Sequence, residues 1–257
     1  MIGFILGTSE GKKILSLVNE YTDEIAVSTA TNYGGQLLKE FRVKDLNTKP
    51  LDKEHMLKWM EFNKIEVLVD ASHPYAKEVT QNAINCCEET GIEYIRYERL
   101  GALEDIKSHN IIRVSNYEEA INEIKKINGN ILNTTGGNNV QKFIDIDFNH
   151  RIIHRILPST KVLDKIINYG VKIKDIIALQ GPISYELEKA FIHQYEAYAI
   201  LTKDSGIEGG VLEKFKAVTD CNIKLIVIEK PKFNYKIQFN HEAELVEFLV
   251  KNYNVDY

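Results

Sequence analysis

Short apolar runs recur along the whole chain, and most are followed by a turn and then by residues with helical spacing. Such runs are typical of parallel strands buried on both faces, and their alternation with helices predicts an α/β fold. The expected strands span residues 2–6, 24–31, 66–70, 92–97, 111–114, 130–133, 151–156, 176–179, 197–201 and 225–228.

This alternation breaks once, in the polar and poorly patterned segment 100–109, and then restarts. We therefore expect two Rossmann-like parallel-sheet domains, residues 1–105 and 106–257. In open α/β sheets, ligands bind beyond the carboxyl ends of the strands, so two such domains are expected to face a shared cleft.

The composition narrows the functional classes. The net charge of −5 gives no overall positive field for nucleic acid or an anionic membrane. We expect a cytoplasmic protein, because no apolar run is long enough to span a bilayer and no signal-peptide pattern precedes the first strand. Cys86, Cys87 and Cys221 lack the spacing of a zinc site, so we expect no metal site.

A glycine-containing turn follows the first expected strand. Gly7 and Gly11 flank Thr8 and Ser9, and a helix follows. Glycines of this kind let a phosphate approach the backbone, and helix amides point at it. The turn does not match G-x-G-x-x-G and lacks the lysine of a P-loop, so a simple helix cap at Thr8 or Ser9 is the alternative.

The second expected strand carries Ser28 and Thr29 where an NAD-binding fold usually places a carboxylate. Without that negative charge, the 2′-phosphate of NADP would meet no repulsion, so NADP is favoured over NAD if a dinucleotide binds. The alternative is that Ser and Thr merely suit a strand end.

The third expected strand ends abruptly in a polar turn. Asp70, Ser72 and His73 follow the apolar residues, and Pro74 keeps His73 out of the helical region. A histidine held at this edge is a candidate site residue. The alternative is an ordinary turn whose histidine faces water.

Basic side chains follow several later strands. Arg96 and Arg99 could hold ligand carboxylates or form surface ion pairs with Glu93 or Glu98. Polar side chains also fall on strand ends in the second half, namely Arg155, Gln180, Lys203, Asp204 and Ser205. The basic groups collected at these strand ends would suit an anionic ligand within an acidic protein. The alternatives are an ion pair of Arg155 with Asp147 or Asp164, and a solvated Lys203.

Seven segments, in this order, make the chain resemble the precorrin-6A reductase family of corrin biosynthesis, including its cobalt-precorrin-6A branch. They are ILGTSEG (5–11), DASHPYA (70–76), YIRYER (94–99), NTTG (133–136), RILP (155–158), QGPIS (180–184) and TKDSG (202–206). The resemblance implies a two-domain reductase that uses NADPH to reduce a ring double bond of (cobalt-)precorrin-6A, giving (cobalt-)precorrin-6B.

The resemblance also implies roles for the candidate residues. The expected NADPH-binding residues are Gly7, Thr8, Ser9, Gly11, Ser28, Thr29, Ser72, Thr135 and Gly136. The expected tetrapyrrole-binding residues are Tyr75, Arg96, Arg99, Arg155, Gln180, Lys203 and Ser205. His73 and Lys203 are the candidate proton donors. The first domain would bind NADPH and the second the substrate, with transient contacts to other corrin-pathway enzymes.

Two other functions stay open. One is an NADP-dependent reductase of another anionic substrate, because a fold does not determine a function. The other is a nucleotide-sensing module without chemistry. The sequence also leaves open whether the tetrapyrrole carries cobalt.

Overall fold

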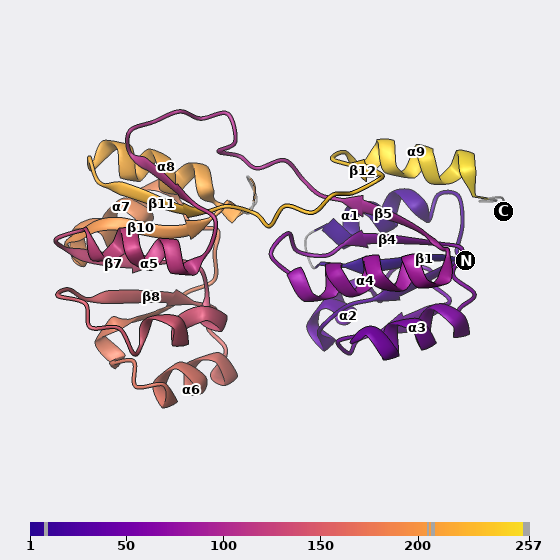
Figure 1. Cartoon of the computed structure of the whole chain (residues 1–257), viewed down its shortest axis with the longest axis horizontal. Coiled ribbons are helices and arrows are strands. Elements are labelled where there is room, and N and C mark those ends of the chain that lie inside the picture. Colours follow the sequence, from indigo (N-terminus) through magenta and orange to yellow (C-terminus); the bar gives the residue numbers. More distant parts are fainter. Residues whose placement is uncertain (8–9, 205, 207–208, 254–257) are drawn as a thin grey trace. The chain divides into compact units, whose positions relative to one another are not determined.

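The computed structural model describes residues 1–7, 10–204, 206 and 209–253. They form two compact units: residues 1–99 with the segment from Pro231 onward, and Leu100–Lys230 (Figure 1). Each unit is built on a six-stranded sheet in which every neighbouring pair of strands is parallel. The expectation of an α/β fold with two Rossmann-like parallel sheets is confirmed.

The first sheet has the strand order β12-β5-β4-β1-β2-β3. Its strands are β1 (Ile2–Leu6), β2 (Ile25–Ser28), β3 (Asp45–Asn47), β4 (Val67–Ala71), β5 (Glu93–Tyr97) and β12 (Gln238–Phe239). Starting from β3, this is the order 3-2-1-4-5-6 of dinucleotide-binding folds. From β1 the next two strands, β2 and β3, are added on one side of β1. The later strands β4, β5 and β12 are added on its other side, so the strand order reverses between β1 and β4.

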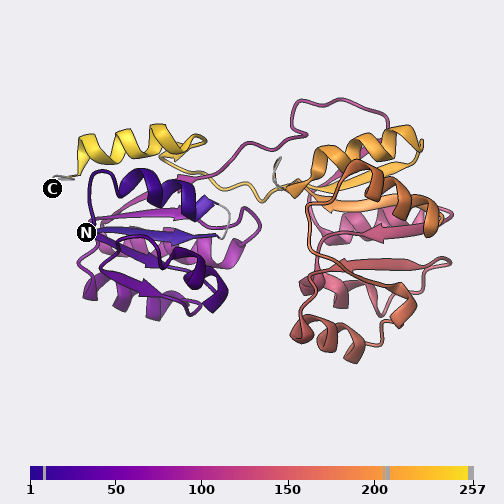
Figure 2. The same cartoon turned by 180° about the vertical axis from the view of Figure 1, so that it is seen from behind.

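Helices cover both faces of the first sheet (Figures 1 and 2). One face packs against α1 (Glu10–Val18), α2 (Asn32–Leu38) and α9 (Glu242–Asn252). The other packs against α3 (Lys53–Phe62) and α4 (Lys77–Thr90). Successive residues of β1 serve opposite faces, as the strand period requires, because Phe4 joins the first core and Ile5 the second.

The second sheet has the order β6-β11-β10-β7-β8-β9. Its strands are β6 (Ile111–Val114), β7 (Asn130–Asn133), β8 (Ile152–Ile156), β9 (Ile176–Ala178), β10 (Ala197–Lys203) and β11 (Lys224–Ile228). Its helices are α5 (Tyr117–Lys125), η1 (Gly137–Phe143), α6 (Thr160–Asn168), η2 (Ile173–Asp175), α7 (Tyr185–Gln194) and α8 (Val211–Asp220). Here the order reverses between β7 and β10.

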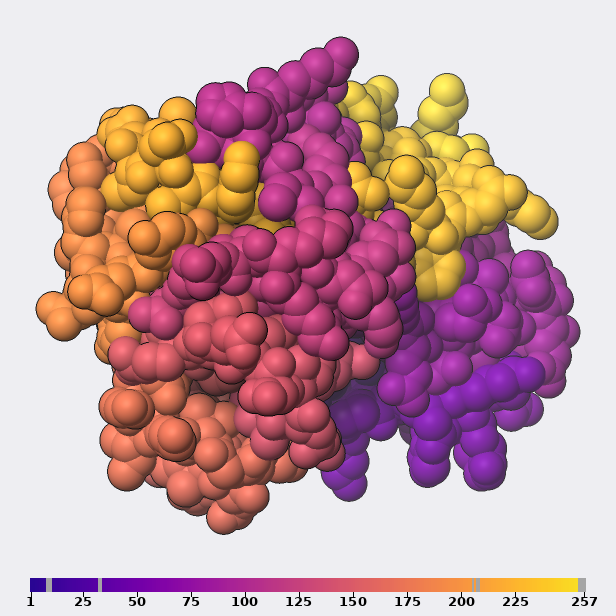
Figure 3. All heavy atoms as spheres, turned by 60° about the vertical axis from the view of Figure 1, so that its left-hand side comes forward, coloured from indigo at the N-terminus to yellow at the C-terminus, as the bar shows by residue number. Residues whose placement is uncertain are grey.

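The expected domain ranges need one correction. Residues 106–257 do not form one unit, because the chain returns to the first sheet after β11. Strand β12 pairs with β5, and Leu245 and Leu249 of α9 join the core that contains α1. In Figure 3 the yellow spheres at the right, from this segment, lie against purple spheres of the first unit. The segment covers an edge strand and an apolar helix face that local pattern alone could not assign to it.

None of the helices in the described part of the chain is long and apolar enough to cross a lipid bilayer.

Candidate functional site

A cavity of about 500 Å³ lies at the carboxyl ends of β1, β2 and β4, where the order of the first sheet reverses. Ligands of open α/β sheets bind at this reversal. Five of the residues expected in the site line the cavity together: Gly7, Ser28, Thr29, Ser72 and His73. The first unit therefore brings the three sequence-predicted turns to one pocket.

The two glycines of the turn after β1 have different structural roles. Gly7 lines the cavity, and its amide donates to the carbonyl of Ala71 at 3.0 Å. Gly11 is buried, and a Cβ added there would lie 3.3 Å from Leu6 Cδ1 and 3.4 Å from Leu38 Cδ2. The structure thus gives Gly11 a packing role between helix and strand, and its expected phosphate contact stays a prediction. Thr8 and Ser9 lie outside the described residues.

The end of β2 supplies hydroxyl groups and no carboxylate to the cavity wall. Ser28 and Thr29 are each 3% exposed. The Ser28 hydroxyl accepts from Asn47 Nδ2 at 2.9 Å, and the Thr29 hydroxyl donates to the Thr31 carbonyl at 3.1 Å. Each hydroxyl is thus oriented by one bond within the protein, and the Ser28 hydroxyl still has its own proton with which to donate to a ligand.

One lining residue that the sequence analysis missed is Lys49, which follows the short strand β3. The three residues of β3 are too few to display a strand pattern, so nothing marked this lysine as a strand-end residue. Asp52 and Glu78 also line the cavity. The Asp52 carboxylate accepts from His55 N at 2.9 Å, as expected of the residue that caps α3.

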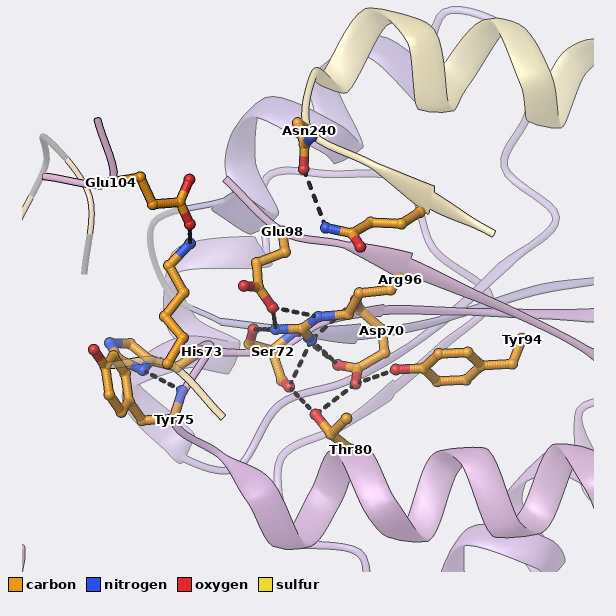
Figure 4. Close-up of polar contacts among 12 residues, drawn as sticks. Asp70, Ser72, His73, Tyr75, Thr80, Tyr94, Arg96, Glu98, Glu104 and Asn240 are labelled. Atoms are coloured by element: carbon orange, nitrogen blue, oxygen red, sulfur yellow. Dashed lines mark hydrogen bonds and ion pairs between the residues drawn. The ribbon is translucent and has the colours of Figure 1, made fainter. Parts of the chain in front are cut away.

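His73 lies exposed on the turn between β4 and α4, beside buried Pro74 (Figure 4). Its Nδ1 accepts from the Tyr75 amide at 3.3 Å, and the two rings lie 5.7 Å apart. With Nδ1 accepting, the proton of the neutral imidazole resides on Nε2. The side chain that could transfer a proton is thus presented at the rim of the cavity.

Arg96 corrects a prediction. Its side chain is only 1% exposed and forms ion pairs with Asp70 Oδ1 and Glu98 Oε2, each at 3.0 Å. Burial alone would lower its pKa, but the Asp70 and Glu98 charges outweigh that effect and raise the pKa of Arg96. A buried, fully paired guanidinium does not meet a substrate, so its expected binding role is wrong. The sheet register places Arg96 directly beside Asp70.

In the second unit, Thr135 and Gly136 follow β7. The Thr135 amide and hydroxyl both donate to Asn133 Oδ1, at 3.0 and 2.8 Å. Gly136 has φ of +86°, a conformation that favours glycine. These two residues belong to the second unit and are not part of the cavity wall in the first unit.

Lys203 ends β10, at the reversal of the second sheet, and is half-buried. Burial lowers the pKa of its ammonium group. The next residue, Asp204, accepts from the amides of Ala102 and Leu103, each at 3.0 Å, and so anchors the segment that enters this unit. Ser205 lies outside the described residues.

Arg155 is held by a partner that the sequence did not indicate. Its Nη1 donates to Glu188 Oε1 at 2.8 Å, rather than to Asp147 or Asp164. Lys214 Nζ lies 3.7 Å from the same oxygen. The Arg155 side chain is 11% exposed, so little of it is accessible to a substrate. Of the remaining expected substrate residues, Gln180 is exposed, and Tyr75 and Arg99 are half-buried.

Comparison with known proteins identifies the family. The model of the family described as precorrin-6x reductase CbiJ/CobK matches residues 2–250. The chain belongs to the precorrin-6x reductase family. As a member, it is an oxidoreductase of the precorrin-6A reductase type, and the family belongs to cobalamin biosynthesis.

Several members of the precorrin-6x reductase family are similar over nearly the full chain. The cobalt-precorrin-6A reductase of Methanocaldococcus jannaschii is 37% identical, over 93% of this chain and 92% of that protein. The cobalt-precorrin-6A reductase of Priestia megaterium is 33% identical, over 97% and 98%. The solved structure of CobK precorrin-6A reductase shares the fold, with a TM-score of 0.78 at 14% identity, and the match covers 100% of this chain and 98% of that one.

Proposed function

We propose that this protein transfers a hydride from NADPH to cobalt-precorrin-6A and thereby forms cobalt-precorrin-6B. One observation carries the proposal: a member of a reductase family has a cavity at the strand reversal of a dinucleotide-type sheet, and the end of β2 offers no carboxylate there. The NADPH nicotinamide supplies the hydride, and a second group must supply a proton to complete the reduction.

The lining of the cavity suits NADPH. Gly7 and Ser72 would border the cofactor at the ends of β1 and β4, and His73 would lie beside its reactive end. Lys49 would attract the 2′-phosphate, while the absence of an acidic residue at the end of β2 removes the hydrogen-bond acceptor that NAD-specific folds offer to the ribose. These residues bind and orient the cofactor, so the protein needs no covalent nucleophile.

The cobalt form is favoured as substrate by the similarities. Relatives named cobalt-precorrin-6A reductase are up to 37% identical, whereas the precorrin-6A reductase of Mycobacterium tuberculosis is 24% identical over 67% of this chain. The acetate and propionate groups of the macrocycle require cationic or hydrogen-bonding partners. Arg99, Gln180 and Lys203 are the proposed partners, with Arg155 contributing only through its small exposed part.

Two groups can donate the proton. His73 is exposed, and as an imidazolium it would donate a proton from Nε2, while the lowered pKa of Lys203 makes its ammonium a better donor near neutral pH than an exposed lysine. We propose His73 as the main proton donor because it lines the cavity proposed for NADPH. The proposal also places the enzyme in the cytoplasm, with a small-molecule substrate and transient contacts to other corrin-pathway enzymes.

An anaerobic incubation tests this function. The protein is mixed with cobalt-precorrin-6A or metal-free precorrin-6A, each with NADPH or NADH, and the product is followed by mass and by loss of reduced-nicotinamide absorbance. We expect a gain of two hydrogen atoms, fastest with the cobalt substrate and NADPH. Folded protein that binds NADPH and reduces neither macrocycle would contradict the proposal.

A further inference from the structure

Asp70, near the end of β4, is a fully buried carboxylate whose two oxygens are both saturated by donors. Its Oδ1 accepts from the Ser72 amide at 2.9 Å and pairs with Arg96 Nη1 at 3.0 Å. Its Oδ2 accepts from the hydroxyls of Thr80 at 2.8 Å and Tyr94 at 2.9 Å. Figure 4 shows these side chains converging on Asp70 from α4 and β5.

Stability alone does not explain this arrangement. Burying a carboxylate and a guanidinium costs desolvation energy, and well-packed apolar residues often serve a core equally well or better. Leu68, two residues earlier on the same face of β4, lies in the apolar core against α3 and α4, so this face of the strand accepts apolar side chains. We therefore attribute the polar residues around Asp70 to the need to hold the backbone next to it in one conformation.

The buried polar residues around Asp70 hold the two turns that line the cavity in place. Asp70 binds the Ser72 amide, and Arg96 Nη2 donates to the Ser72 carbonyl at 3.2 Å. Between these bonds, the Ala71 carbonyl accepts from the Gly7 amide at 3.0 Å. The same short stretch of backbone is therefore bonded to the buried set and to the turn after β1.

Thr80 and Tyr94 complete the set from elements outside the turn. Burial raises the pKa of Tyr94, so its phenol stays protonated and donates to Asp70. Neither residue lines the cavity, so neither is in a position to contact the cofactor there. The Thr80 hydroxyl also lies 3.4 Å from the Ser72 hydroxyl, so any effect of the two hydroxyls on the reaction must pass through Asp70 or directly through Ser72 to the Ser72–His73 turn.

We propose that Thr80 and Tyr94 are positioning residues: through Asp70 they hold the Ser72–His73 turn against the Gly7 turn, so that the nicotinamide and His73 are correctly placed for transfer. This inference rests on the proposed NADPH-dependent reduction. Loss of one hydroxyl removes one of the two donors to Asp70 Oδ2 and loosens the turn in part, whereas loss of both frees this carboxylate oxygen and lets the turn move further.

The test uses Thr80→Val, Tyr94→Phe and the double variant. Thr80→Ser keeps the hydroxyl, and Tyr198→Phe removes the same atom from an exposed side chain in the second unit. A misplacement of about 1 Å lowers rates by up to about a hundredfold, so we expect a roughly tenfold lower kcat for the double variant. The KM for the tetrapyrrole should change less than about twofold.

A second readout separates positioning from stability. With NADPH deuterated at the transferred position, the isotope effect on kcat should rise in the double variant, because hydride transfer becomes the slow step. Thr80→Ser and Tyr198→Phe should match the unsubstituted protein in kcat and isotope effect. A folded double variant with a lower melting temperature but unchanged kcat and isotope effect would overturn the proposal. If the double variant does not fold, Tyr94→Phe takes its place: an isotope effect larger than that of Tyr198→Phe supports the proposal, and an equal one overturns it.

A failure of the proposed function would be seen separately, in the unsubstituted protein. The positioning role is then tested without turnover, through NADPH affinity and the NMR resonances of the His73 ring. The double variant should bind NADPH several-fold more weakly and shift the His73 resonances. If neither changes, the positioning role is refuted even though no reaction has been measured.

Discussion

Replacing Arg96 with methionine tests whether this arginine acts as a structural partner or as a substrate ligand. The substitution keeps an apolar stem of similar length but removes both ion pairs of the buried guanidinium. Asp70 would then remain fully buried without a counter-charge. We expect a large loss of stability and, in the protein that remains folded, little change in the KM for the tetrapyrrole.

The expected magnitude follows from the contacts. Removing one partner of a buried ion pair typically costs about 3–5 kcal/mol. Asp70 would keep its bonds from Ser72, Thr80 and Tyr94, which favours the lower end, about 3 kcal/mol. Because a domain of ordinary stability unfolds with roughly 5–15 kcal/mol, the variant should stay mostly folded.

Urea unfolding followed by circular dichroism measures this loss from the transition midpoint and slope. Arg96→Lys serves as a milder variant, because one ammonium cannot reproduce the two-pronged contacts of the guanidinium. In the double variant Asp70→Asn, Arg96→Met the two losses should not add, since the buried charge of Asp70 is removed together with its counter-charge, and the ion pair with Glu98 is lost equally in Arg96→Met and in the double variant. The coupling between the two sites should be roughly 1–3 kcal/mol.

One result would refute this reasoning. If Arg96→Lys unfolds at the same urea concentration as the unsubstituted protein while its KM for the tetrapyrrole rises about tenfold or more, Arg96 contacts substrate. The buried network would then not describe the state that binds the macrocycle.

Three further predictions concern single side chains. His73→Asn should lower kcat about a hundredfold or more at saturating NADPH. An unchanged kcat would mean that Lys203 or solvent supplies the proton. Burial lowers the pKa of His154, which is 3% exposed, to about 4. An unfolded histidine has a pKa of about 6.5, so between pH 6.5 and about 4 the unfolded state binds more protons at His154 than the folded state does. The free energy of unfolding should therefore fall by about 3 kcal/mol as the pH drops through this range. Urea unfolding of His154→Asn should show a flatter acid limb, and an equally steep limb would contradict the assignment. Lys49→Ala should raise the KM for NADPH about fivefold to tenfold without changing that for NADH, whereas Lys39→Ala, which is outside the cavity lining, should change neither; equal effects on both cofactors would remove Lys49 from the 2′-phosphate.

The sequence alone determined most of the fold, because its signals are local. The apolar runs located β1, β4 and β10, and local capping residues lie at the start of α3 (Asp52) and at the end of α4 (Gly91). By contrast, β3 and β12 have three and two residues and carry no pattern of their own. They exist as strands because the edges of β2 and β5 offer them hydrogen bonds, so only the tertiary structure reveals them.

The candidate site divides in the same way. Sequence alone placed Gly7, Ser72 and His73 at strand ends, because a strand and the turn that follows it are set by adjacent residues. Only the tertiary structure decided that Arg96 faces Asp70 and that Arg155 faces Glu188. Ion-pair partners depend on register and packing between segments far apart in the chain, and no local pattern of polar and apolar residues records that register.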